Sequence, residues 1–530
     1  MLRLDQIRLT PDQPESVLRR KAARLLRIAP EQIEELQILR RAVDAREQIL
    51  LVYTVAVRIK DEPAVLRRCR DRHVSAYTPR PYRLPDPVSA APALPPVVVG
   101  AGPAGLFAAL ILAHAGLRPI LLERGKCAED RAADVTRFWQ TGLLNTESNV
   151  QFGEGGAGAF SDGKLNTGTK DPRHRWILEQ LVACGAPESI LVDGRPHVGT
   201  DYLHKVLRQL RQKLQALGCE IRFSQRLEQL HHENGALTGL TVRQSDGSLT
   251  RIPCQRVILA LGHSARDTFQ MLYDCGMELE AKPFAVGVRI EHRQKDIDTI
   301  QYKEFAGHPA LGAATYKLSC HLPNGRSVFS FCVCPGGQVV AAASETERVA
   351  TNGMSEYARS GENINGALLV NVTPADFPSS HPLAGIEFQR RLEETAYNPG
   401  GGYRAPCQRV EDFLAGRPSA SAGTVLPSYR PGVVWTDLHR VLPDFIADSL
   451  RQALPILDRK LPGFAAPDAV LTAVESRSSS PVRMVRDKTY QSTRIRGVYP
   501  CGEGAGYAGG ILSAATDGMR CAEQIIGGIQ

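Results

Sequence analysis

Three glycines near residue 100 have the spacing of a turn that binds phosphate groups. Gly100, Gly102 and Gly105 follow an apolar run at 97–99 and precede an apolar stretch at 106–115. In such a strand–turn–helix the first glycine permits the tight turn. The second lets the backbone approach a pyrophosphate, and the third allows the helix to pack closely on the strand. The first turn of the helix would also offer unpaired N–H groups to the phosphates.

An acidic residue at the end of the next expected strand supports the same site. Glu123 lies 18 residues after Gly105, and Arg124 follows it directly. A carboxylate at this position accepts hydrogen bonds from ribose hydroxyls. Strand, turn, helix and acidic residue occur together here, and this combination is far more specific than the glycine spacing alone. The sequence therefore predicts a dinucleotide site.

Two later segments indicate which dinucleotide the site takes. Glu503 stands in a glycine-rich turn between an apolar strand and a helix, and 256–262 resembles a strand that ends at Gly262. In FAD-binding proteins a late acidic residue bonds the ribityl chain, and a helix N-terminus stabilises negative charge on the reduced flavin. Three suitable segments so far apart favour FAD over NAD. The alternative is that the late glycine-rich turn is only structural.

Two other stretches carry polar groups that suit the flavin or a substrate. The loop at 153–165 has glycines that allow close backbone approach, and Ser161 and Lys164 can form hydrogen bonds; the alternative is a structural turn. In the stretch ESRSSSPVRM at 475–484, Arg477 and Arg483 flank three serines and a proline. Because arginine clamps carboxylates in a bidentate fashion, these two are the candidate catalytic residues. The alternative is a pair of structural or surface arginines.

The predicted cofactor site draws on four parts of the chain. Its residues are Gly100, Gly102, Pro103, Ala104, Gly105, Glu123, Arg124, Gly156, Ser161, Lys164, Gly262, Gly502, Glu503, Gly509, Gly510 and Ile511. No metal site is predicted, because the 13 histidines are dispersed and the 12 cysteines include no CxxC pair. His263 is interpreted as structural rather than catalytic.

Two cysteines, Cys332 and Cys334, stand on an expected strand before a Pro-Gly-Gly turn. Strand alternation would put both on one face. Redox chemistry with a flavin is one interpretation. Buried small hydrophobes are the favoured one, because no CxxxxC pair accompanies the dinucleotide motif as it does in disulfide reductases.

Eight segments resemble one known family, the bacterial FAD-dependent dehydrogenases, often called simply FAD-dependent proteins, of the glutathione-reductase-type flavoprotein superfamily. They are GAGPAGLFAAL, GEGGAGAFSDGKL, PHVGTD, ALGHSARDTF, FCVCPGGQVV, TNGMS, ESRSSSPVRMVRD and CGEGAGYAGGILSAATDG. The resemblance spans about 96–530 and implies fold and cofactor. It implies little about the reaction, because the family has no settled substrate.

The expected fold is α/β, an FAD-binding Rossmann-type (glutathione-reductase-like) fold with an inserted α+β substrate or cap domain and a small N-terminal α+β domain. The domains are predicted at 1–78 (basic accessory domain), 79–95 (proline-rich linker), 96–275 and 476–530 (FAD binding), and 276–475 (insertion). Strands are expected at 2–9 and 49–59, helices at 14–28, 172–185 and 200–217, and mostly loop from 130 to 170.

The charge of the chain is concentrated at its N-terminus. Residues 1–85 hold 18 Lys and Arg against 11 Asp and Glu, a net charge of +7, whereas the other 445 residues are almost balanced at +1. Arg20, Arg24 and Arg27 share one face of the expected helix at 14–28. Such a face is either a solvated surface or a binding surface for an anion such as RNA.

These features predict an FAD-dependent oxidoreductase that moves a hydride through flavin N5 to or from a small molecule. Because only one GxGxxG turn has its strand and helix, NAD(P)H would dock only transiently. The alternatives are a flavoprotein that acts on RNA through its basic N-terminal domain and a non-catalytic flavin-binding protein. A cytoplasmic location with reduced thiols is expected. No association with a membrane is expected, because prolines and glycines break the charge-free stretch at 87–117.

Overall fold

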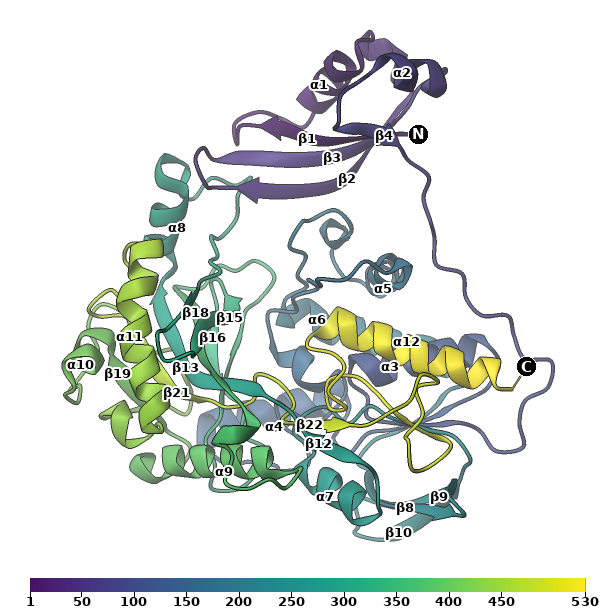
Figure 1. The fold of residues 1–530 in the computed structure, drawn as a ribbon, viewed down its shortest axis with the longest axis vertical. Helices are drawn as coiled ribbons and strands as arrows, with labels where there is room; N and C mark the ends of the chain where they lie inside the picture. Colours follow the sequence, from purple (N-terminus) through teal and green to yellow (C-terminus); the bar gives the residue numbers. More distant parts are fainter. Residues whose placement is uncertain (530) are drawn as a thin grey trace.

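A five-stranded parallel sheet carries the predicted glycine turns at the ends of its strands (Figure 1). The computed structural model describes residues 1–529. The strands are β5 (Val97–Val99), β6 (Ile120–Leu122), β7 (Glu220–Arg222), β11 (Val257–Leu259) and β23 (Val498–Pro500), in the order β23-β11-β5-β6-β7. β5, β6, β11 and β23 are fully buried, as their apolar sequences require. β6 and β7 follow β5 on one side, whereas β11 and β23 lie on its other side. The direction of winding therefore reverses between β5 and β11. Ligands bind at such a switch point in parallel sheets.

Two helices, α3 (Pro103–His114) and α12 (Ile511–Gly527), lie side by side against this sheet (Figure 1). α3 is apolar on all sides because it is buried between the sheet and α12. The two helices approach closely at Gly518, where a Cβ atom would lie 2.0 Å from the carbonyl oxygen of Ala104. The C-terminal helix thus locks the first turn of the helix that begins at the glycine motif.

The expectation of mostly loop between 130 and 170 is wrong for its first part. Helix α4 covers Ala128–Thr141. Its buried positions recur at helical spacing, with Val135 and Phe138 in the core, and Gly142 ends it in the left-handed conformation. The predicted helices at 172–185 and 200–217 are α5 (Pro172–Ala183) and α6 (Thr200–Ala216).

A three-stranded antiparallel sheet follows α6 and β7. It consists of β8 (Arg226–Glu233), β9 (Ala236–Arg243) and β10 (Leu249–Pro253). α7 (Arg266–Asp274) then leads away from β11. The two-stranded pair β12 (Leu279–Ala281) and β22 (Val482–Met484) joins the start and the end of the next region.

The second large sheet is mixed and has seven strands in the order β14-β15-β18-β13-β21-β19-β20. Its strands are β13 (Phe284–Arg293), β14 (Ser319–His321), β15 (Ser327–Cys334), β18 (Asn363–Val372), β19 (Ala405–Arg409), β20 (Val433–Trp435) and β21 (Val470–Glu475). Helices α9 (Ala384–Tyr397), α10 (Val410–Ala415) and α11 (Asp444–Lys460) lie on its outer side, with α8 (Gln294–Tyr302) at one end (Figure 1). A hairpin of β16 (Gln338–Ala341) and β17 (Thr351–Met354) lies against its inner side. β13 and β18 are almost completely buried at the centre.

The N-terminal residues form a four-stranded antiparallel sheet with two helices. The elements are β1 (Leu2–Leu9), α1 (Val17–Leu26), β2 (Glu35–Asp44), β3 (Leu50–Arg58), α2 (Glu62–Arg68) and β4 (Val74–Ala76), and the sheet order is β2-β3-β1-β4. The predicted strands at 2–9 and 49–59 and the helix at 14–28 are present. The sequence does not predict β2. A bulge between Ile38 and Arg40 interrupts its alternation of apolar and polar residues, and none of its residues is fully buried. Arg20, Arg24 and Arg27 are exposed, which fits a solvated surface as well as an anion-binding one.

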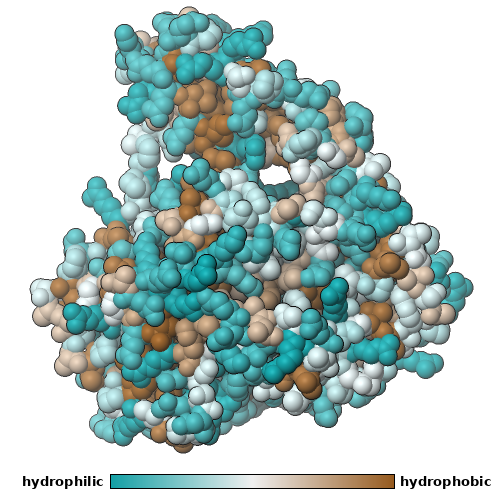
Figure 2. All heavy atoms as spheres, turned by 180° about the vertical axis from the view of Figure 1, so that it is seen from behind, coloured by the Kyte–Doolittle hydropathy of each residue, from teal (hydrophilic) through white to brown (hydrophobic). Residues whose placement is uncertain are grey.

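This small domain stands as a separate lobe above the rest of the molecule (Figure 2). Its attachment is partly main-chain pairing, because the Arg41 N–H donates to the Val192 carbonyl at 2.7 Å and the Arg41 carbonyl accepts from Gly194 at 2.6 Å. The proline-rich segment at 79–96 runs along the body, where Tyr82 donates a hydrogen bond to Glu523 at 2.6 Å. Among residues 1–529, no helix has the length and apolar character that crossing a bilayer requires.

The α3–α12 contact gives a direct test of the fold. Alanine normally favours a helix over glycine by about 1 kcal/mol. At Gly518, however, the added methyl group collides with the Ala104 backbone, and such overpacking costs about 1–3 kcal/mol. We expect Gly518→Ala to lower the melting temperature in thermal unfolding. The matched control is Gly527→Ala in the same helix, where no atom lies within 4 Å of the added group; equal melting temperatures for the two variants would contradict the packing described.

Candidate flavin site

A cavity of about 380 Å³ opens at the carboxyl ends of β5 and β11. Its walls come from the glycine turn at 99–104, residues 123–124 after β6, the loop at 151–166, the segment 225–227, the loop at 260–268 and the late turn at 501–511. The remaining wall consists of residues 331–332 of β15, 352 of β17 and 475–478 at the end of β21. The parallel sheet, whose switch point faces this cavity, therefore brings together segments that are more than four hundred residues apart, such as Val99 and Ile511.

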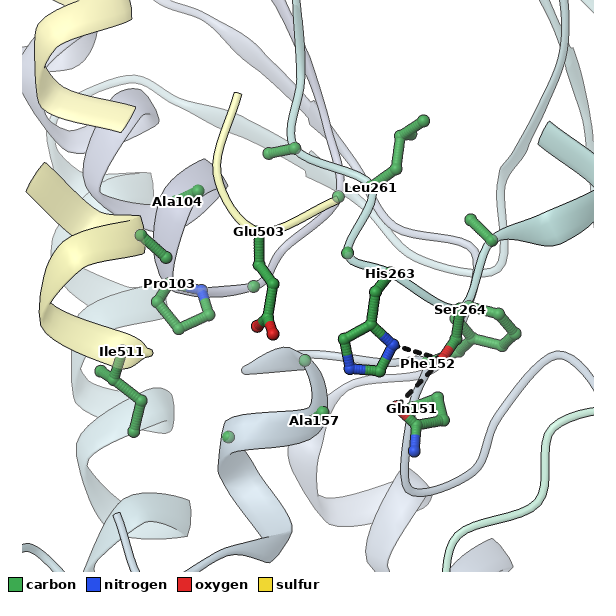
Figure 3. A pocket seen from close by; sticks show the side chains of 18 of the residues that line it. Pro103, Ala104, Gln151, Phe152, Ala157, Leu261, His263, Ser264, Glu503 and Ile511 are labelled. Carbon is green, nitrogen blue, oxygen red and sulfur yellow. Dashed lines mark hydrogen bonds between the residues drawn. The ribbon is translucent and has the colours of Figure 1, made fainter. Parts of the chain in front are cut away.

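Most of the residues predicted from the sequence line this cavity. They are Gly100, Gly102, Pro103, Ala104, Glu123, Arg124, Gly156, Ser161, Lys164, Gly262, Arg477, Glu503, Gly509, Gly510 and Ile511. Figure 3 shows the side chains of Pro103, Ala104 and Ile511 on one side and that of Glu503 directed into the space between them and His263.

Three predicted residues do not line the cavity. Gly105 packs helix on strand, since a Cβ there would lie 1.8 Å from the Gly100 carbonyl oxygen. Gly502 donates its N–H to Asp517 at 2.8 Å and so shapes the late turn. The prediction of Arg483 as a catalytic residue is not supported by its position: it is exposed, and its guanidinium lies over the ring of Tyr507.

Two glycine-rich turns meet at the cavity wall with only backbone between them. Gly100 has a φ of 103°, and a Cβ there would lie 2.3 Å from the Ala260 carbonyl oxygen. Gly156, with a φ of 58°, stands against Gly102, and a Cβ on Gly156 would lie 3.2 Å from the Gly102 Cα. Gly102 also caps α3, whose first N–H groups face the same place. This side-chain-free cradle fits a pyrophosphate.

Glu123 is held at the cavity by three backbone donors. Its Oε2 accepts from Ala101 at 2.8 Å, and its Oε1 accepts from Gly125 and Gly153, both at 2.9 Å. A carboxylate offers about four acceptor positions, so one remains on Oε2. The remaining position suits a ribose hydroxyl, as the sequence predicts. Neighbouring Arg124 is held by Glu147 and Asp267.

The carboxyl group of Glu503 projects into the cavity, as Figure 3 shows. Burial raises the pKa of Glu503 to about 7, and this effect outweighs the opposing charge of Lys282. Near neutral pH this group can therefore either donate or accept a hydrogen bond. That is the property required beside a hydroxyl of the ribityl chain.

His263 lies in the cavity, although the sequence suggests a structural role. Its Nδ1 lies 2.9 Å from the Ser264 hydroxyl, which donates to the Gln151 side chain at 3.2 Å (Figure 3). Burial, together with the positive charges of Arg477 and Arg266, lowers the pKa of His263 to about 3. The imidazole is therefore neutral. Sequence reasoning missed Gln151, which stands in no motif, and Ser264, which lies in the segment ALGHSARDTF but was given no role there.

Arg477 is fixed by a buried carboxylate and is not free to clamp a substrate. Its Nε and Nη2 donate to the two oxygens of Glu393 at 2.9 and 2.8 Å, and Arg266 binds the same carboxylate at 2.7 and 2.9 Å. Glu393 is fully buried on α9, and the two guanidinium groups hold its pKa far below the usual range, although burial opposes this. The bidentate clamp predicted for Arg477 thus exists, but its partner belongs to the protein. Nη1 of Arg477 donates to Ser264 and Ser344.

The N-terminus of α12 faces the cavity at Gly509, Gly510 and Ile511. α12 has 17 residues, so its unpaired N–H groups and its dipole present positive potential there. A flavin ring that gains negative charge on reduction would be stabilised at this position. Glycine cradle, ribose acceptor, ribityl partner and helix N-terminus together fit FAD.

One other buried group has the composition of a metal site. Cys501, Asp517 and Cys521 have ligand atoms within 4.8 Å of one another. Arg486 donates to both oxygens of Asp517 at 2.9 and 2.7 Å and lies 3.8 Å from the Cys521 sulfur. The guanidinium of Arg486 therefore already supplies the positive charge that a metal ion would bring to Asp517 and Cys521.

Gly102 allows the cradle to be tested without disturbing the fold. Its φ of −76° is open to any residue, and an added Cβ would meet only Gly156 Cα at 3.9 Å. We expect Gly102→Val to melt at the wild-type temperature in the FAD-free form but to bind FAD at least about tenfold more weakly, about 1.4 kcal/mol. Fluorescence titration with FAD measures the affinity. The control is Gly168→Ala, outside the cavity; wild-type affinity in Gly102→Val would overturn the placement of the pyrophosphate.

The raised pKa of Glu503 predicts a pH dependence of stability. In the unfolded chain this carboxyl group ionises near 4.5, whereas in the folded protein its pKa is about 7. Raising the pH through this window therefore favours the unfolded state, by at most about 1.4 kcal/mol per pH unit for one group. In FAD-free protein we expect Glu503→Gln to gain stability relative to wild type between about pH 5 and pH 8 in chemical unfolding. Glu280→Gln, at an exposed glutamate, should follow the wild type; a Glu503→Gln curve parallel to wild type would contradict the burial.

Comparison with known proteins agrees with this site. Residues 94–136 match the model of the FAD binding domain, and residues 283–478 match that of the FAD-dependent protein, C-terminal domain-like. Residues 1–58 match a domain of unknown function (DUF8436). These matches identify FAD as the cofactor.

Two solved structures are similar only in broad outline. The flavin-dependent brominase Bmp2 is 12% identical, with 82% of this chain and 78% of that chain covered and a TM-score of 0.38. A flavoprotein/dehydrogenase from Cytophaga hutchinsonii is 12% identical, with 82% and 79% covered and a TM-score of 0.34. Scores this low carry no functional inference.

An uncharacterized protein of Clostridium beijerinckii is 45% identical over 529 residues, which cover 99% of this chain and 98% of that protein. The chain therefore belongs to one family with the Clostridium protein, and its two flavin-domain matches make it an FAD-dependent protein.

Proposed function

We propose that this protein is an FAD-dependent oxidoreductase that transfers a hydride between flavin N5 and a small-molecule substrate. The observation that carries the proposal is the continuity of the cavity. It extends from the glycine turn after β5 to Cys332 on β15 and to Glu475 and Arg477 at the end of β21, in the seven-stranded region. The far end is thus lined by ionisable groups, which is typical of a reaction site and not of a mere storage site for a cofactor.

The residues of the chain contribute binding, orientation and exclusion of water. The glycine cradle and Glu123 would hold the pyrophosphate and ribose, and Glu503 would bond the ribityl chain. Neutral His263, fixed through Ser264, would present an uncharged hydrogen-bonding group to a substrate. FAD, when bound, supplies the hydride acceptor and donor.

Burial of Glu475 raises its pKa to about 7, against the effect of Arg289. This carboxyl group lines the same end of the cavity, so it can hold or release a proton near neutral pH. We propose it as the proton-exchanging group for the substrate.

The seven-stranded region would serve as the substrate domain, because its residues line the far end of the cavity. NAD(P)H would dock transiently at the flavin, because the chain has one glycine turn of the dinucleotide type with its strand and helix.

Anaerobic reduction tests the proposed reaction. We expect NADH or NADPH, or a small organic substrate from a screen, to bleach the visible absorbance of the bound FAD, and an acceptor to restore it. Glu475→Gln should slow this cycle by about tenfold to a thousandfold, as loss of a proton-transfer group does. Glu280→Gln, at an exposed glutamate, is the control. A flavin that no donor reduces, in protein that retains FAD, would favour the non-catalytic alternative.

A further inference from the structure

Strand β15 contains a bulge that turns Cys332 toward the flavin cavity. Phe331 pairs with Ala367 on β18, but Cys334 pairs with Asn365, so β15 has one extra residue at this point. Cys332 takes up the irregularity with a φ of 41°, which is rare for a residue other than glycine. Bulges next to active sites re-aim side chains in this way. Simple alternation, expected from the sequence, therefore does not hold, and Cys332 lines the cavity while Cys334 is fully buried.

The two cysteines remain in contact despite the bulge. The Cys334 thiol donates a hydrogen bond to the Cys332 carbonyl oxygen at 3.3 Å. All twelve cysteines are free thiols in the structure. One sulfur of the pair faces the cavity, and the other is fully buried.

Two cationic side chains converge on this pair. Nζ of Lys164 lies 4.0 Å from the Cys334 sulfur, and Nη2 of Arg289 lies 3.8 Å from it. Arg289 is completely buried and also donates to the Cys332 carbonyl oxygen at 3.0 Å. Lys164 lines the flavin cavity.

The charge of these cations is only partly balanced by carboxylates. Asp162 lies 2.9 Å from Lys164 but is shared with Arg359, and Glu475 is 3.6 Å from Arg289. Because the pKa of Glu475 is raised to about 7, this carboxyl group is partly neutral at physiological pH. A buried arginine without a full countercharge is costly, so the site favours an additional anion. A thiolate at the cysteine pair supplies it.

The ionisation of Cys332 differs from that of the other buried cysteines. The neighbouring Cys334 side chain, together with Lys164 and Arg289, lowers the pKa of Cys332 although burial opposes this. Burial raises the pKa of Cys219 and of Cys254 to about 12. A thiolate is the reactive form of cysteine, and this is the environment in which cysteines react.

We propose that Cys332 and Cys334 form a redox-active dithiol that exchanges two electrons with the bound FAD. In the oxidising direction the Cys332 thiolate and the Cys334 thiol form a disulfide bond. The S–H bond of Cys334 breaks, and its proton and the electron pair pass to FAD, which is reduced. The reverse step reduces the disulfide and reoxidises the flavin. FAD, the cofactor of this protein, is the only other reactant.

A packing role explains these features less well. A cysteine that only fills space needs neither a left-handed backbone, which costs about 1–3 kcal/mol, nor two cations beside it. Cys332 is also partly exposed to the cavity, where Phe331 and Asn352 are its neighbours in the wall. The bulge places a nucleophilic sulfur, and not an apolar surface, at the reaction end.

An anaerobic dithionite titration of the FAD-loaded, preoxidised protein tests the proposal. We expect the wild type to take up twice the electrons per FAD that the flavin alone requires. We expect Cys332→Ser and Cys334→Ser to take up only the flavin equivalent. The matched control is Cys69→Ser, at a half-buried cysteine of the N-terminal domain, which should behave as the wild type.

A second measurement does not depend on the flavin or on the folding of any variant. Wild-type protein is treated with one equivalent of diamide, alkylated and digested with trypsin. Both cysteines lie in the peptide 327–348. We expect this peptide to carry no alkyl label after oxidation and two labels after reduction. The proposal would be overturned if the wild type took up only the electrons that its flavin requires. It would also be overturned if the cysteines of this peptide were still labelled after oxidation. Neither result bears on hydride transfer to a substrate.

Discussion

The backbone around the end of β5 has to pass closer to its neighbours than any side chain would permit. At Gly100 the chain meets the carbonyl of Ala260 on the adjacent strand, and at Gly518 helix α12 meets the first turn of α3. Both contacts leave less than 2.5 Å for a Cβ atom. They bring the first and last parts of the chain to one point, and the empty space that remains in front of α3 is the cavity. The cofactor site is therefore a consequence of the close packing that the glycines allow.

A buried ion cluster fixes the other side of the cavity. Glu393 comes from α9 in the seven-stranded region, Arg266 from α7 beside the parallel sheet, and Arg477 from the segment that returns between them. Burying one carboxylate between two guanidinium groups carries a large desolvation cost, and loss of any partner would leave a charge uncompensated. The cluster gives little net stability, but its buried bonds join α9 of the seven-stranded region to α7 beside the parallel sheet. That junction sets His263 and Ser264 at the cavity wall.

Local motifs explain what could be predicted from the sequence. The glycine turn, Glu123 and Glu503 are recognised because each stands in a short segment whose strand and helix can be read from neighbouring residues. Helix α4 was missed because polar residues surround its few apolar positions. Gln151, Glu393 and Glu475 were missed because their roles depend on partners more than eighty residues away. Cys332 was assigned to the wrong environment because a one-residue bulge, which no local pattern signals, changes the direction of its side chain.

The electrostatics of the cavity link the cofactor end to the cysteine end. The N-terminus of α12 favours negative charge on one side, and Lys164 and Arg289 favour it on the other. The carboxyl groups between them, Glu503 and Glu475, have pKa values raised to about 7 and so carry only part of a full negative charge each at neutral pH. Positive potential in a low-dielectric space stabilises whichever group carries the electrons, a reduced flavin or a thiolate. Because the Cys332 charge itself contributes to the raised pKa of Glu503, protonation at the ribityl end and ionisation at the sulfur are coupled.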